Sequence, residues 1–183
     1  LLLTAADIRA VGPGTWNGWK GQLLRTLYHE TEAVVSGGVT QVAFNQRIAA
    51  AQEVFRKAAA SDPAIDVDKT IARHYPDYWL KTEPKKQLEH ARLMRRMDEK
   101  GQTFVTDCTT DAFTAVTELT VLAPNHPRLL ALFAGACASA GANIVDAQIY
   151  TTTDGRALDT IAISREYDRD EDEGRRATRI GEM

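Results

Sequence analysis

Two polar residues, Asn125 and His126, lie between prolines in the stretch VLAPNHPRLLALF, residues 121–133, where an apolar, strand-like segment leads into a leucine-rich helical segment. A strand that turns directly into a helix leaves backbone N–H groups and the positive end of the helix dipole facing the loop. Such a loop can hold a small carboxylate, and an asparagine there can cap the helix or hydrogen-bond a ligand. The stretch therefore predicts a binding site without catalytic chemistry.

Other motifs give weak support for catalysis. The segment GPGTWNG, residues 12–18, has the glycines of a phosphate loop but follows a helical segment and lacks the Gly-Lys-Ser/Thr ending. Asp66 and Asp68 could hold Mg²⁺, yet they follow Pro63 at a helix start, where acidic residues favour the helix dipole. The histidines share no metal-ligand spacing, so we expect surface or loop positions for all of them: His29, His74, His90 and His126.

Composition indicates an ordinary globular protein. The 183 residues include 22 Lys+Arg and 25 Asp+Glu, and 44% are hydrophobic, which fits one or two packed domains. The net charge of −3 argues against nucleic-acid binding, and no segment has the length of a membrane span or the form of a signal peptide. Cys108 and Cys137 are interpreted as core residues rather than a disulfide framework. We therefore expect a cytoplasmic protein with no nucleic-acid or membrane partner.

Helical spacing dominates residues 1 to about 100, where apolar residues recur at three- and four-residue steps. One set is Trp16, Trp19, Leu23, Leu27 and Val34, and a second is Phe44, Ile48, Ala51, Phe55 and Ala58. We expect Trp16, Trp19, Leu23 and Leu27 to be core residues. A last helix, about 84–99, would place Leu88, Ala91, Met94 and Met97 on one face.

The pattern becomes strand-like from residue 102, in QTFVTDCT, FTAVTELTVLA, ANIVDAQIYTTT and RALDTIAIS. Asp154-Gly155 predicts a tight hairpin, and one helix at about 127–140 separates the second strand from the third. This order predicts an α+β protein whose second part is the front of a ferredoxin-like βαββαβ unit. The absence of an initiator Met and of a helix cap at the acidic end predicts truncation at both ends, before the last strand. We expect the missing strand to leave apolar surface exposed or paired with a neighbour.

Three segments carry a family resemblance. LTAADIRAVGPGTWNGWKGQLLRTLYHETE, residues 3–32, resembles the segment that closes the HD domain of bifunctional PII uridylyltransferase/uridylyl-removing enzymes. VLAPNHPRLLALFAGACASAGANIVDAQIYTTTDGRALDTIAI, residues 121–163, resembles the first of their two C-terminal ACT domains, and RHYPDYWL, residues 73–80, fits the helical linker between them. The resemblance divides the chain into the end of an HD domain and a linker over 1–100, and an incomplete ACT domain over 101–183.

The resemblance implies an intact enzyme with separate activities. One domain would transfer UMP from UTP to a tyrosine of the signal protein PII, an HD domain with Mg²⁺ or Mn²⁺ would remove it, and ACT domains would sense glutamine. Asp7 matches the last aspartate of the HD metal set. A single carboxylate cannot hold a divalent ion, because several ligands must converge to offset the ion's desolvation. We therefore expect this chain alone to hold no metal and to be inactive.

The ACT resemblance also implies a ligand site. ACT loops often read Asp-Arg-Pro-Gly, but here the run is Asn125-His126-Pro127-Arg128, which lacks a negative charge for an amino acid's ammonium group. Asp146 on the facing strand is one candidate to supply that charge. The implied ligand-binding residues are Asn125, His126, Arg128, Leu129, Asn143, Ile144 and Asp146.

Two functions from different classes stay open. The first is a regulatory segment that binds glutamine or transmits its binding. The second is an interaction module without a ligand, in which the sheet forms a homodimer, because an unpaired sheet edge invites pairing with another copy. A glutamine titration separates the two.

Asp7 gives a testable prediction for the intact enzyme. If Asp7 completes the HD metal set, Asp7→Ala should reduce uridylyl removal by at least ~100-fold, because a metal ligand matters more than the groups that support it. UMP transfer uses different carboxylates and should stay within a few-fold. Both rates are measured on one purified variant: unchanged removal rules out the metal role, and equal loss of both activities indicates misfolding.

Overall fold

The structure is a computed structural model that describes residues 2–12, 24–25, 27–28, 31–32, 35, 41–111 and 116–182. The chain divides into two compact units, Leu1–Ala49 and Ala50–Met183. The first contains α1 (Leu2–Ala10), and α3 (Gln41–Ala59) extends from the first unit into the second. The predicted division into residues 1–100 and 101–183 stays a prediction, because it rests on correspondence to other proteins rather than on compactness.

One core prediction for the first unit is wrong. Leu27 was predicted to be a core residue but is 58% exposed. The prediction failed because helical spacing shows which residues share a face, not whether another element packs against that face. The companion residues Trp16, Trp19 and Leu23 lie outside the described residues. For α3 the predicted face is confirmed: Phe44, Ile48, Ala51 and Ala58 are half-buried and Phe55 is fully buried.

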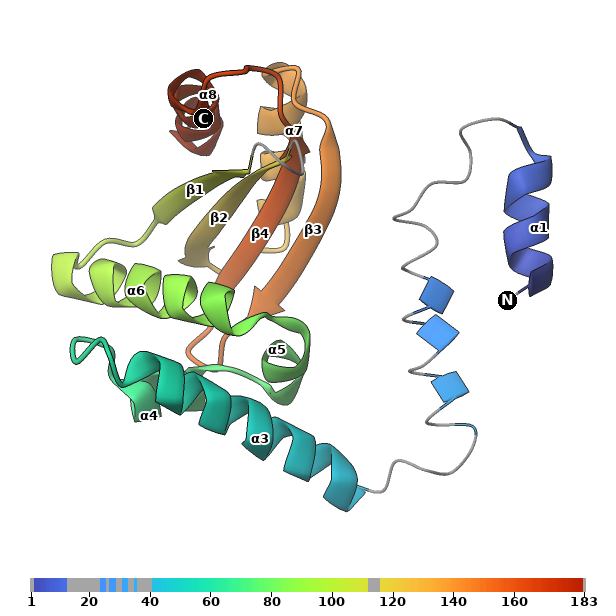
Figure 1. Ribbon diagram of the computed structural model, residues 1–183. Coiled ribbons are helices and arrows are strands. Elements are labelled where there is room, and N and C mark those ends of the chain that lie inside the picture. The colour runs from blue at the N-terminus through green and yellow to red at the C-terminus, as the bar shows by residue number, and fades with distance from the viewer. Residues whose placement is uncertain are drawn as a thin grey trace. The chain divides into compact units, whose positions relative to one another are not determined.

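The second unit contains the remaining described elements, in the predicted order of helices followed by strands (Figure 1). They are α4 (Val67–Arg73), α5 (Pro76–Lys81), α6 (Pro84–Lys100), β1 (Val105–Asp111), β2 (Val116–Pro124), α7 (Leu129–Ser139), β3 (Ile144–Thr151), β4 (Arg156–Ser164) and α8 (Asp170–Glu182). The α+β class and the ferredoxin-like arrangement are confirmed.

Local sequence signals set the helix ends. The Asp66 side chain accepts a hydrogen bond from the Lys69 N–H group at 2.9 Å, which confirms its predicted role as a cap. Pro76 and Pro84 begin α5 and α6, where a missing N–H group costs nothing. Gly101 ends α6 with φ of 60°, a left-handed conformation that favours glycine.

The sheet has four antiparallel strands in the order β1-β2-β4-β3. The sequence predicts that the missing last strand leaves apolar surface exposed or paired with a neighbour, and in a βαββαβ unit that strand would lie beside β2. Instead β1, which precedes the unit in the chain, occupies that edge and pairs with β2 from Val105↔Leu122 to Asp111↔Val116. The predicted hairpin is confirmed, with Gly155 at φ of 79° between β3 and β4.

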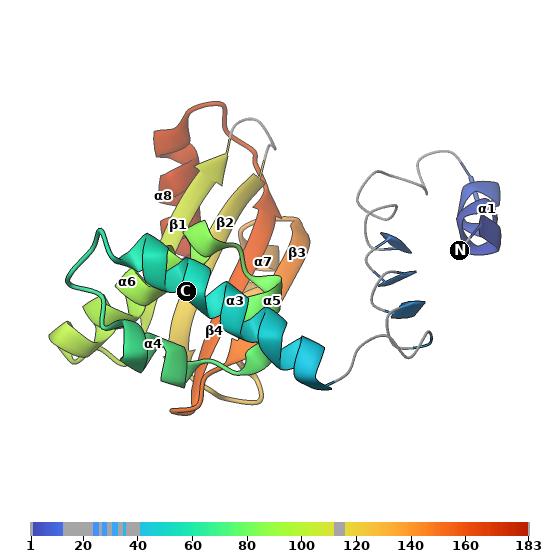
Figure 2. The ribbon, with the colours of Figure 1, turned by 60° about the horizontal axis from the view of Figure 1, so that its bottom comes forward.

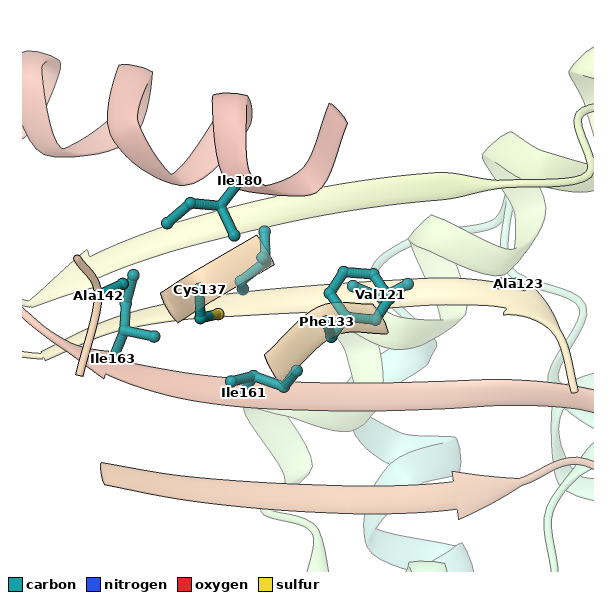
Figure 3. Packing of buried hydrophobic residues seen from close by; sticks show 9 residues of the cluster. Val121, Ala123, Phe133, Cys137, Ala142, Ile161, Ile163 and Ile180 are labelled. Carbon is teal, nitrogen blue, oxygen red and sulfur yellow. The ribbon is translucent and has the colours of Figure 1, made fainter. Parts of the chain in front are cut away.

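The two faces of the sheet are covered by different helices (Figure 2). On one face, α7 and α8 pack on alternate strand residues to form the core shown in Figure 3, which includes Leu119, Phe133, Cys137, Ile161 and Ile180. This confirms Cys137 as a core residue. Because strand side chains alternate, the intervening residues of β2 and β4 face α6 on the other side.

Helix α6 is buried along most of its length because it lies between the sheet and the other helices. Of the four residues predicted to share a face, Ala91, Met94 and Met97 are buried and Leu88 is half-buried. The ring centroids of Phe55 on α3 and Trp79 on α5 lie 5.2 Å apart. Helices α4, α5 and α6 and the second half of α3 are therefore packed as part of the second unit.

Leu119 tests the α7–α8 core. Leu119→Ala should lower the free energy of unfolding by ~2–5 kcal/mol, because a fully buried leucine leaves a cavity when shortened. The matched control is Leu132→Ala on α7, a residue 65% exposed, which should change it by less than ~0.5 kcal/mol. Urea denaturation measures both, and equal effects would contradict this assignment of the core.

Candidate functional site

The loop between β2 and α7 is held by its own backbone. The Asn125 N–H group donates to the Gly155 carbonyl at 3.1 Å, which ties the loop to the β3–β4 hairpin. The His126 ring accepts from the Arg128 N–H group through Nδ1 at 3.2 Å, while Arg128, at the N-cap position, makes no side-chain cap. All three side chains are exposed. The loop thus presents polar side chains beside an uncapped helix end, and its role as a carboxylate site stays a prediction.

The other predicted ligand residues lie near the opposite end of the sheet. The Asn143 carbonyl accepts from the Ser164 N–H group at 2.8 Å, just before β3 begins. Ile144 is 37% exposed, and Asp146 pairs across the sheet with Ala162. Leu129, in contrast, belongs with the loop group at the first turn of α7.

The predicted ligand residues therefore form two groups within one chain. Pro124 pairs with Arg156, whereas Asp146 pairs with Ala162, six positions further along β4. At about 3.4 Å per residue, the groups lie roughly 20 Å apart along the strands. A small ligand cannot contact both groups in one copy. A single site built from both would need a second copy of the chain.

Asp7 lies on α1 in the first unit and is exposed. Within the described ranges, no group of three or more His, Cys, Asp or Glu side chains could hold a metal ion. The metal role of Asp7 stays a prediction for a longer protein, in which further ligands would have to reach it.

A cluster of charged side chains joins the helices to the hairpin. Asp98 on α6 accepts hydrogen bonds from Arg73 at 2.6 Å, Lys69 at 3.0 Å and Arg156 at 3.0 Å. Asp154 lies 3.3 Å from the Arg73 Nε atom and 3.6 Å from the Arg156 Nε atom. We call these five residues the ionic junction. It connects α4, α6 and the β3–β4 hairpin.

Burial alone would raise the pKa of Asp98, but the hydrogen bonds from Lys69, Arg73 and Arg156 outweigh it and hold the pKa well below its ordinary value. The Asp98 side chain is 23% exposed and that of Arg73 is 13% exposed, so solvent screens the pair only partly. A carboxylate bonded to three cations in such surroundings stays ionised.

Backbone contacts reinforce the junction. Thr153 in the hairpin donates its N–H group to the Arg73 carbonyl and its hydroxyl to the Ala72 carbonyl, both at 2.9 Å. His74 and Thr152 form an isolated antiparallel bridge. Because Asn125 also bonds the hairpin, the β2–α7 loop, the hairpin and α4 form one continuous set of contacts.

Two histidines predicted at surface or loop positions are buried. His90, within α6, is 2% exposed, so the prediction of a surface or loop position is wrong for it; His74 is 6% exposed but lies in the α4–α5 connection, as a loop position requires. His74 stacks on Tyr78 with ring centroids 3.6 Å apart, and the Tyr78 hydroxyl lies 3.1 Å from the His90 Nδ1 atom. Burial is the largest cause that lowers the pKa of His74 to about 3 and that of His90 to about 4, so both rings are neutral at pH 7. His126 is exposed, as predicted, and His29 lies outside the described residues.

Some of these features had signals in the sequence. His90 follows the helical spacing of buried Gln87, Met94 and Met97, and His74 adjoins the aromatic run YPDYW. The ionic junction had none, because its members come from separate elements. No sequence signal indicated that Asp159 is buried either. Its side chain is 2% exposed, and its Oδ1 atom has no hydrogen-bond partner among the described residues. Burial raises the pKa of Asp159 to about 6.

Comparison with known proteins gives relatives that match almost the entire chain. A bifunctional uridylyltransferase/uridylyl-removing enzyme of Bradyrhizobium diazoefficiens is 63% identical over 182 residues, covering 100% of this chain and 20% of the relative. Proteins of the same name from Rhodopseudomonas palustris and Nitrobacter hamburgensis are 62% and 61% identical over 99% and 100% of this chain, and 20% of each relative is covered. No family model matches the chain.

The resemblance to bifunctional uridylyltransferase/uridylyl-removing enzymes is thereby confirmed, and the identity extends along the whole chain; the assignment of an HD end and an ACT domain stays a prediction. The chain spans about one fifth of the length of these relatives. Within the described helices, none is long and apolar enough to cross a membrane.

The ionic junction can be tested through Asp98. Asp98→Asn should lower the free energy of unfolding by ~1–3 kcal/mol at pH 7, because a neutral amide replaces a carboxylate bonded to three cations. Since the pKa of Asp98 is lowered in the folded state, its contribution is complete above the ordinary carboxyl pKa of about 4 and is lost as the pH falls through the folded value. The difference between wild type and variant should therefore shrink below about pH 4.

The control for this measurement is Asp77→Asn, which removes an exposed pair with Lys81 at 3.5 Å. That substitution should cost less than ~0.5 kcal/mol at pH 7. Denaturation curves from pH 2 to 8 compare the two variants. A similar loss for both, or a loss for Asp98→Asn that is independent of pH, would contradict the role of the junction.

Proposed function

We infer that this chain belongs to the bifunctional uridylyltransferase/uridylyl-removing enzymes and is a regulatory segment of one of them. The observation that carries this inference is the match along the chain at 61–63% identity to three enzymes of that name. The intact enzyme would attach a uridylyl group to the signal protein PII and remove it, with Mg²⁺ or Mn²⁺ bound at sites completed by residues outside this chain. Its setting would be the cytoplasm.

The regulatory role is to bind glutamine or to transmit its binding. A ligand changes a protein's state only if it binds one conformation better than another. The support for such an effect is the continuous contact from the β2–α7 loop, through Asn125 and Gly155, to the hairpin and then to α4 through Thr153. A ligand that rearranged the loop or the hairpin would change the support of α4 and α6.

A second candidate function is dimerisation, and the β3 edge favours it. Strand β3 is at the edge of the sheet and, among the described strands, pairs with β4 alone. Val145 and Ile149 on this strand are 39% and 47% exposed. An edge strand with apolar side chains is suited to pairing with a second sheet. In that case the helices would serve as a spacer, without a ligand.

Titration calorimetry with L-glutamine tests the proposal on the 183-residue chain. We expect saturable heat, and slower hydrogen exchange of α4 and hairpin amides at saturation, because binding shifts the chain toward its more ordered state. L-Leucine is the control, since it has the same charged groups and no side-chain amide.

The absence of heat with L-glutamine would contradict the regulatory proposal. If the chain then sediments as a dimer at micromolar concentration, the second candidate is favoured. Substitution of Ile149 by Lys would place a charge on the exposed edge and should shift such a dimer to monomer.

A further inference from the structure

A polar cavity of about 220 Å³ lies between the sheet and the start of α6, on the face opposite α7 and α8. Its walls come from the α5–α6 connection and from three strands, and include Thr82, Lys86, Glu118, Asp146, Gln148 and Thr160. The volume is below the usual range for drug-sized ligands and corresponds to roughly seven water molecules at ~30 Å³ each. It suits a metabolite of amino-acid size and excludes a nucleotide.

Strand register explains why space is left at this position. Ala162 on β4 pairs with Glu118 on one side and with Asp146 on the other, so a methyl group lies between two carboxylates. The next row inward pairs Thr160 with Gln148. Neighbouring strands are about 4.8 Å apart, so the two acidic residues are roughly 10 Å apart across the small alanine. The cavity is thus built into the sheet and does not depend on a single side-chain rotamer.

The two carboxylates are in different states. Glu118 forms an ion pair with Lys86, which lies 2.9 Å from Glu89 as well. Asp146 is exposed, and its side chain has no hydrogen bond or ion pair with any described residue. Glu118 is therefore neutralised from within the protein, whereas Asp146 remains available to a positive group; Lys81 and Glu83, at the end of α5 and the start of α6, also line the cavity.

A positive group is available at the other side of the cavity. The Lys86 ammonium has three N–H donors, of which Glu89 and Glu118 use two, so one remains for a ligand carboxylate. Lys86 is in the first turn of α6, where Glu83 makes no side-chain cap and the helix dipole favours negative charge. A ligand carboxylate beside Lys86 would be stabilised both by the free N–H donor of the ammonium group and by the helix dipole.

The polar lining of the cavity also indicates what kind of side chain a ligand with these two charged groups would carry. The Thr160 hydroxyl lies 3.4 Å from the His90 Nε2 atom, and the Thr82 hydroxyl donates to the Tyr150 hydroxyl at 3.2 Å. Gln148 can both donate and accept a hydrogen bond. Ala162 is the one apolar residue among those that line the cavity. A polar side chain would find further hydrogen-bond partners here, whereas a branched apolar one would have only Ala162 as an apolar contact.

We propose that this cavity binds a small zwitterion, an α-amino acid with a polar side chain, with its ammonium on Asp146 and its carboxylate on Lys86. A simple anion would meet the unpaired carboxylate of Asp146, and a simple cation would leave the remaining N–H donor of Lys86 without a partner, whereas a ligand with both charges uses both groups. The proposal rests on the proposed function and gives its amino acid a site distinct from the β2–α7 loop.

Such a ligand would bridge the sheet and the helices. Asp146 belongs to β3 and Lys86 to α6, so a bound molecule would add a link between them. Behind the cavity, Thr160 contacts His90, which contacts Tyr78, which stacks on His74 beside the hairpin. Occupancy of the cavity would therefore favour the conformation in which α5 and α6 are docked on the sheet.

The test is calorimetry on the 183-residue chain with L-glutamine and with N-acetyl-L-glutamine, which lacks the ammonium group. We expect L-glutamine to bind, and its N-acetyl derivative to bind at least ~tenfold more weakly, because a charge-assisted hydrogen bond is lost. Asp146→Asn should weaken L-glutamine binding at least ~tenfold for the same reason. Asp107→Asn, an exposed carboxylate on β1 away from the cavity, is the matched control and should leave binding unchanged.

A parallel variant in the loop, Asn125→Ala, separates the two locations. If Asn125→Ala abolishes binding and Asp146→Asn leaves it unchanged, the cavity proposal is overturned and the proposed function stands. If L-glutamine does not bind the wild-type chain, both are overturned. Circular dichroism confirms that each variant is folded, and Gln148→Leu provides a second variant of the cavity, for which we expect weaker binding of L-glutamine.

Discussion

The placement of the helices on the sheet depends on one carboxylate, that of Asp98. An isolated surface ion pair contributes little, because solvent screens it and side-chain entropy opposes it. Asp98 differs because it accepts hydrogen bonds from three cationic side chains on two other elements and is mostly shielded from solvent. The resulting ionic junction fixes α4 and α6 against the β3–β4 hairpin. Thr153 then aligns the hairpin backbone with the end of α4.

Sequence patterns were sufficient for features that depend on neighbours in the chain. The period of apolar residues predicted α6 within one residue at its end, and Asp154-Gly155 predicted the hairpin. Asp66 was identified as a cap because caps are local. The ionic junction and the cavity beside Ala162 could not be predicted in this way, because each depends on which strands and helices become neighbours.

The candidate binding residues illustrate the same limit. Asn125 and Asp146 are both polar and follow the expected elements, but strand register places them near opposite ends of the sheet. The Asn125 loop contacts the hairpin, whereas Asp146 faces the cavity beside α6. The loop is connected to α4 through the hairpin, and Asp146 lines the same cavity as Lys86 of α6. A ligand at the loop would contact the hairpin, whereas a ligand at the cavity would contact the start of α6.

The edge position of β1 determines which residues are needed for a complete, separately folding sheet. The strand beside β2 comes from before the βαββ segment rather than after it, so the folding module does not coincide with the stretch that carries the ACT resemblance. Moving residues 116–182 alone into another protein would remove seven residue pairs from the sheet and expose one side of β2. A transplantable sensor would have to begin upstream of Val105. Because the ionic junction uses Lys69 and Arg73, it would also have to carry α4 to α6 if it is to pass a signal to its new host.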